Sequence, residues 1–123
     1  GGVPPGVAAA CIAAIQVLET EPDHVRKVWK NREYFLKAMK DLGFDTGNTE
    51  TPIVPVMCGE SKTAKDLANF IWEKGVFSLP IVYPMVTRDK ARIRVQLCTK
   101  HKKEQLDKAV QAFEEGGKKL GLI

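Results

Sequence analysis

The chain has 123 residues and a net charge of +4, with 44% hydrophobic and 28% charged residues. These totals indicate one globular domain with a modest core. No apolar run approaches the roughly 20 residues that span a bilayer, so we do not predict an integral membrane protein. The basic residues gather late in the chain but have neither a recognition helix nor interleaved aromatic residues, so we do not predict nucleic-acid binding.

The first predicted helix runs from Val7 to Leu18, and Pro4 and Pro5 open it, since proline is tolerated in a first helical turn. Its residues are small or aliphatic around nearly the whole circumference. A helix that is apolar all round is buried all round. We therefore expect a partner domain or a second subunit to cover it.

A second helix follows an acidic break at 19–23, with Pro22 in its first turn. Apolar residues recur every three or four positions up to Leu42, which predicts one packed face, and Gly43 stands where a C-terminal glycine cap belongs. Residues 1–43 are thus expected to be two linking helices, and residues 44–123 a small α/β domain.

The segment Thr51 to Cys58 predicts a strand that is apolar on both faces and therefore interior. Pro52 and Pro55 lack an N–H, so each should lie at the strand start, at a bulge or at an edge. A helix capped by Ser61 or Thr63 should follow and end at Gly75.

A short strand over 76–80 and a proline-containing loop lead to the most informative segment, 91–99. Ile93, Val95 and Leu97 alternate with polar residues, which is typical of a strand with one apolar face. Arg92 and Arg94 lie on the other face, where guanidinium groups match carboxylate or phosphate oxygens in a two-pronged geometry. Composition alone favours a solvated strand face. A last helix is predicted over 103–120.

This order of elements predicts an α/β (α+β two-layer) fold, with a small, mostly antiparallel sheet covered by helices on one face. The chain shows no catalytic residues of its own. His24 and His101 have no metal-ligand spacing, so we predict no metal site. Three cysteines without a CxxC pair indicate a reducing compartment rather than a thiol nucleophile, and no lysine has a glycine-rich, Schiff-base setting.

Four segments, in order along the chain, resemble the C-terminal region of the α-oxoamine synthases. These are pyridoxal-phosphate (PLP) enzymes of the fold-type-I aminotransferase superfamily, and the glycine C-acetyltransferase (2-amino-3-ketobutyrate CoA ligase) branch looks most similar. The segments are TPIVPV (51–56), GVFSLPIVYPMV (75–86), ARIRVQL (91–97) and EQLDKAVQAFEEGGKKLGLI (104–123).

The resemblance implies that the chain is the C-terminal small domain of a homodimeric enzyme that condenses an amino acid with an acyl-CoA to give an α-amino ketone. It implies that Arg94 grips the substrate carboxylate. The cofactor-binding large domain, with the Schiff-base lysine, lies upstream in this family, so we expect this chain alone to be inactive and to hold no covalently bound PLP. A cytoplasmic location is implied, or the mitochondrial matrix in a eukaryote.

The chain departs from the family pattern at three places. Gly1 and Gly2 replace a serine- or threonine-containing stretch that reaches the cofactor phosphate of the neighbouring subunit, so only a fringe of that contact is expected. His101-Lys102 replaces the usual His-Thr before the last helix, where Thr99 could cap instead. Residues 85–87 replace a commoner Val-Pro.

Two other functions stay open from the sequence. One is a stand-alone α/β module that binds a small carboxylate or phosphate ligand through Arg92 and Arg94 without catalysis. The other is an interaction domain whose apolar first helix is the docking surface. The first residues resemble mid-protein sequence, so we expect a longer enzyme, and a lysine in a glycine-rich setting about 30–40 residues upstream would favour the synthase.

Overall fold

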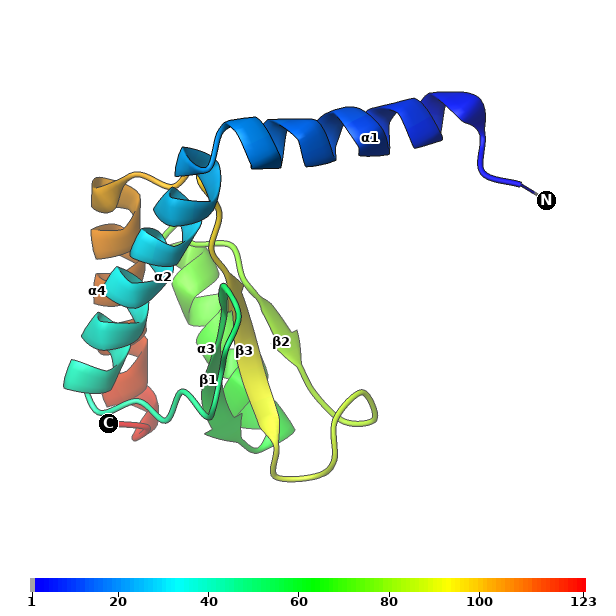
Figure 1. The fold of residues 1–123 in the computed structure, drawn as a ribbon. Helices are drawn as coiled ribbons and strands as arrows, with labels where there is room; N and C mark the ends of the chain where they lie inside the picture. Colours follow the sequence, from blue (N-terminus) through cyan, green and yellow to red (C-terminus); the bar gives the residue numbers. More distant parts are fainter. Residues whose placement is uncertain (1) are drawn as a thin grey trace.

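The computed structural model describes residues 2–123. Helices α1 (Pro5–Thr20) and α2 (Asp23–Asp41) precede strand β1 (Ile53–Gly59) and helix α3 (Ser61–Glu73). Strands β2 (Leu79–Ile81) and β3 (Ala91–Gln96) and helix α4 (Lys103–Leu120) complete the chain. Both strand pairs are antiparallel, with β3 between β1 and β2. The predicted fold class, a small antiparallel sheet with helices on one face, is confirmed (Figure 1).

Helix α3 contacts all three strands, and α4 packs on α3 and α2. The reason lies in the spacing of the apolar residues of α3. Ala64, Leu67, Ala68 and Ile71 recur at intervals of three and four, so they form one buried stripe. Phe113 of α4 completes this core.

Two consecutive glycines in α4 allow its close packing. A Cβ atom on Gly116 would lie 2.7 Å from Leu67 Cδ1, and one on Gly117 would lie 2.4 Å from Phe44 Cζ. Neither position has room for a side chain. The sequence alone suggests only that these glycines weaken the helix, whereas the structure shows that they bring the helix against its neighbours.

Strand β1 is an edge strand, so the prediction of an interior strand was wrong. Its outer edge is occupied within the chain. The N–H of Ile53 donates to Thr51 Oγ1 at 3.2 Å, and the N–H of Met57 donates to the carbonyl of Asp45 at 2.9 Å. Pro55 lies between them and has no N–H to place, which agrees with the edge position considered for this proline.

Other boundaries differ from the predictions. Residues 76–78 precede β2 rather than belong to it, because the N–H of Val76 still bonds to the carbonyl of Ile71 in the last turn of α3. Strand β3 ends at Gln96 rather than at residue 99.

The predicted side-chain caps are also wrong. The residue before α3 is Glu60, which makes no side-chain cap bond, and Ser61 is already helical. Thr99 does not cap α4, because Gln105 Oε1 accepts the N–H of Lys102 instead, at 2.9 Å.

Helix α1 extends away from the rest of the domain (Figure 1). None of its residues is buried within this chain, although Ile12 and Ile15 are among its large apolar side chains. The chain itself therefore does not cover the helix that the sequence predicts to be buried. No helix within residues 2–123 is both long enough and apolar enough to span a membrane.

Candidate functional site

The sheet has one face covered by helices and one open face. The strand register places Pro55 of β1 and Leu79 of β2 on either side of Arg94, and Met57 and Ile81 on either side of Arg92. Directly opposed residues of neighbouring strands share a face. The open face is therefore formed by Ile53, Pro55, Met57, Leu79, Ile81, Arg92, Arg94 and Gln96.

Arg94 is the free cation of this face. It lies in the middle of the central strand, its side chain is exposed, and within residues 2–123 no hydrogen bond or ion pair engages its guanidinium group. Arg92 differs, because it is half-buried and its Nε donates to the carbonyl of Lys90 at 3.0 Å. The structure thus separates two arginines that the sequence leaves equivalent.

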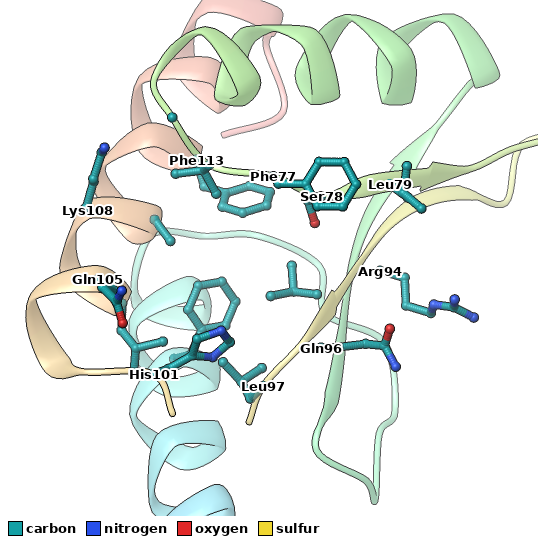
Figure 2. A pocket seen from close by; sticks show the side chains of 16 residues that line it. Phe77, Ser78, Leu79, Arg94, Gln96, Leu97, His101, Gln105, Lys108 and Phe113 are labelled. Atoms are coloured by element: carbon teal, nitrogen blue, oxygen red, sulfur yellow. The ribbon is translucent and has the colours of Figure 1, made fainter. Parts of the chain in front are cut away.

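A pocket of about 570 Å³ lies between β3, the segment 75–79 and α4. Val76, Phe77 and Leu79 contribute apolar surface to it, and His101 and Lys108 contribute polar groups. Figure 2 shows that Arg94 lies at its margin, with the guanidinium group pointing away from α4. The sequence analysis did not find this pocket, although the spacing of polar residues at 101, 105 and 108 is a helical one.

The remaining titratable groups give no sign of catalysis. Burial raises the pKa of the Cys58 thiol to about 11, so this thiol is inert rather than nucleophilic at neutral pH. Every lysine of the chain is exposed, so none has the enclosed setting of a covalent PLP attachment. Among the described residues, no group of three or more potential ligands could hold a metal ion.

The remaining residues considered from the sequence are two glycines, predicted at the fringe of the cofactor site, and two histidines, predicted not to bind a metal. Gly1 lies outside the described residues, and Gly2 is exposed, with open space around it. His24 is a surface residue that pairs with Glu21 at 3.0 Å. His101 has a local structural bond, since its Nδ1 accepts the N–H of Cys98 at 3.3 Å.

The sequence model of the Aminotransferase class I and II family matches residues 1–113. The chain belongs to this family. The predicted resemblance of the chain to the α-oxoamine synthases is also confirmed. The chain is 48% identical, over 98% of its length, to an 8-amino-7-oxononanoate synthase of Symbiobacterium thermophilum. It is 43% identical, again over 98%, to the 8-amino-7-oxononanoate synthase/2-amino-3-ketobutyrate coenzyme A ligase of Thermus thermophilus.

A solved structure gives the same result for the fold. The serine palmitoyltransferase of S. paucimobilis with a bound PLP–myriocin aldimine superposes with a TM-score of 0.87 at 25% identity, over 99% of this chain and 31% of that one. The chain likewise spans 31% and 30% of the length of the two bacterial relatives. The similarity thus covers about a third of an enzyme.

Proposed function

We propose that this chain is the C-terminal small domain of a PLP-dependent acyl-CoA:amino-acid C-acyltransferase, which condenses an amino acid with an acyl-CoA to give an α-amino ketone. The 48% identity to an 8-amino-7-oxononanoate synthase carries this proposal. A glycine C-acetyltransferase activity has the support of one relative with a double name. We therefore propose the reaction class rather than a branch, and a cytoplasmic or mitochondrial-matrix location with it.

PLP, when bound, supplies the electron sink for such a condensation. The residues of this chain do not fit as its attachment site, because all lysines are exposed on the surface. We therefore assign the attachment to a large domain outside this chain, and we assign to this chain a part in substrate binding.

Arg94 is the residue that we propose to bind the amino-acid carboxylate. Ile93 and Val95 point into the helix-covered side, so β3 is anchored while the Arg94 guanidinium faces outward. A guanidinium group can bind a carboxylate through two parallel N–H donors, which fixes the angle of the substrate as well as its position. The stand-alone module, which would use Arg92 as well, is less supported because Arg92 is turned to Lys90.

Steady-state kinetics of the intact enzyme, with the amino acid varied, test this role. We expect Arg94→Ala to lower kcat/KM by roughly ten- to a thousandfold, since charge-assisted hydrogen bonds are worth about 1.5–3 kcal/mol each. The value of kcat should fall too, because the pair orients the substrate. Arg94→Lys should restore only part of the activity.

Arg92→Ala is the matched control, one repeat away on the same face. This substitution should lower kcat/KM clearly less than Arg94→Ala, because the Nε of Arg92 is bound to the carbonyl of Lys90. Equal losses at the two positions, or a fully active lysine variant, would remove Arg94 from the site.

We also propose that α1 is covered by the upstream domain or by a second subunit of a homodimer. The helix exposes Val7, Ile12, Ile15 and Leu18, each more than half accessible. Contiguous apolar patches of this kind mark interaction sites. Sedimentation of the purified 123-residue chain should show self-association, and a dye for exposed apolar surface should bind it. A strictly monomeric chain that binds no dye at high concentration would contradict the proposal.

A further inference from the structure

A row of polar side chains follows one side of α4 where it borders the pocket. His101, Gln105 and Lys108, called here the donor stripe, are spaced four and three residues apart and all line the pocket. Gln105 and Lys108 are neighbours on one face of α4, and His101 lies in the segment just before the first residue of the helix. Figure 2 shows them along the α4 side of the pocket, opposite the margin where Arg94 lies.

Each member of the donor stripe has its acceptor atom already occupied or has none. His101 Nδ1 accepts the N–H of Cys98, which leaves Nε2 as an N–H donor in the neutral ring. Gln105 Oε1 accepts the N–H of Lys102, which leaves its amide NH₂ group. Lys108 is a cation with three donors. The stripe therefore presents donors alone, which suit an acceptor-rich or anionic group.

Charge on the pocket wall agrees with this. No aspartate or glutamate is among the residues that line it, and within residues 2–123 Lys108 has no carboxylate partner. Lys118, further along the same helix, is paired with Glu114 at 2.5 Å. The ammonium group of Lys108 lies at the mouth of the pocket, where a Cβ atom on Gly75 would be 2.8 Å from its Nζ.

Beyond the stripe the pocket is apolar. Its accessible apolar lining consists of Val76, Phe77, Leu79 and Val95, whereas Phe35 and Phe113 are completely buried behind it. The volume of about 570 Å³ lies within the range of about 300–1,000 Å³ that is usual for small-molecule sites. The pocket thus joins an apolar floor to a wall of hydrogen-bond donors.

We propose that this pocket binds a small amphiphile with a single anionic head group. The head, a carboxylate or a phosphate, binds the donor stripe, and the apolar body lies on Val76 and Phe77, whose side chains are accessible. Arg94 also lines the pocket at its margin, but its guanidinium group points away from α4 (Figure 2), so Arg94 and the donor stripe are two different anion-binding positions.

Calorimetric titration of the purified protein with octanoate and with octyl phosphate tests the site, and octan-1-ol is the uncharged control. We expect saturable binding of an anion, and whichever anion binds more tightly identifies the head group. Lys108→Met should weaken anion binding about tenfold, because one charge-assisted contact is lost, and should leave octan-1-ol unchanged. Ala109→Leu, which fills the pocket, should weaken all three.

Lys103→Met is the matched control, since Lys103 lies on the same helix with its Nζ over the ring of Tyr34, outside the pocket. It should bind the anion like the unmodified protein. The proposal is overturned if neither anion binds saturably, if octan-1-ol binds as tightly as the anions, or if Lys103→Met weakens binding as much as Lys108→Met. A loss of anion binding in Arg94→Ala would also overturn it, because the ligand would then belong to the Arg94 site.

Discussion

The two faces of the sheet differ in burial, and neighbouring residues of β3 show the difference. Ile93 is completely buried under the helices, whereas Arg94, the next residue, is exposed on the open face. The covered face is complete within this chain. The open face carries an arginine without a partner among residues 2–123. The hydrophobic core is therefore built on one face of the sheet, and the other face is available to a ligand or a neighbouring domain.

The largest expected effect is on stability, and it compares a substitution on the covered face with one on the open face. Ile93→Ala should lower the free energy of unfolding by about 2–5 kcal/mol, because it leaves a cavity under the helices. Arg94→Ala should change it by no more than about 0.5 kcal/mol, as surface substitutions do. Denaturant unfolding of both variants measures this, and a destabilised Arg94→Ala would mean that the arginine is structural.

The next effect concerns the packing that covers the sheet. Gly117→Ala should destabilise the protein by about 1–3 kcal/mol through overpacking, although alanine is the better helix former. The reason is the 2.4 Å between the added Cβ and Phe44 Cζ. Gly6→Ala in α1, where nothing lies within 4 Å, is the control and should not destabilise. Thermal melts compare the two, and equal melting temperatures would show that the helix can shift at no cost.

The smallest effect is a pH dependence from the covered face. Burial raises the pKa of Cys58 from 9.0 to about 11. Below pH 9 the thiol is protonated in both states. Between these values the unfolded chain loses the proton while the folded protein keeps it, so the free energy of unfolding should fall as pH rises from 9 to 11. Denaturant melts across this range should show a shallower fall in Cys58→Ala, and identical slopes would contradict the burial of the thiol.

The covered face could be predicted well from the sequence. The alternation in 91–97 has the two-residue period of a strand, and the spacing in α3 has the period of a helix. Both predictions hold because the apolar residues of each pattern are the ones buried between the sheet and the helices. Strand order could not be predicted in this way. A segment that is apolar on both faces, 51–58, indicates an interior strand, yet β1 is at the edge, where its second apolar face belongs to the open side of the sheet.

The candidate site was predictable only in part. The strand pattern leaves Arg92 and Arg94 equivalent, and only the family resemblance singles out Arg94. The structural difference between them includes a bond from Arg92 to a backbone carbonyl, which no sequence pattern reveals. Nor could it find the donor stripe, because only the fold brings the backbone N–H groups that occupy the acceptor atoms of His101 and Gln105 and leave their donors free. The cap of α4 was missed for a similar reason, since Gln105 in the first turn accepts the N–H of Lys102, a bond that the residue type at 99 does not predict.

The arrangement at β1 has a consequence for how copies of this chain behave toward one another. An edge strand with a free row of N–H groups is a template for aggregation. Along the outer edge of β1 the N–H of Ile53 is taken by Thr51, that of Met57 is taken by Asp45, and Pro55 has none. Another chain in extended conformation would find no donor there, so intermolecular growth of the sheet is blocked at β1.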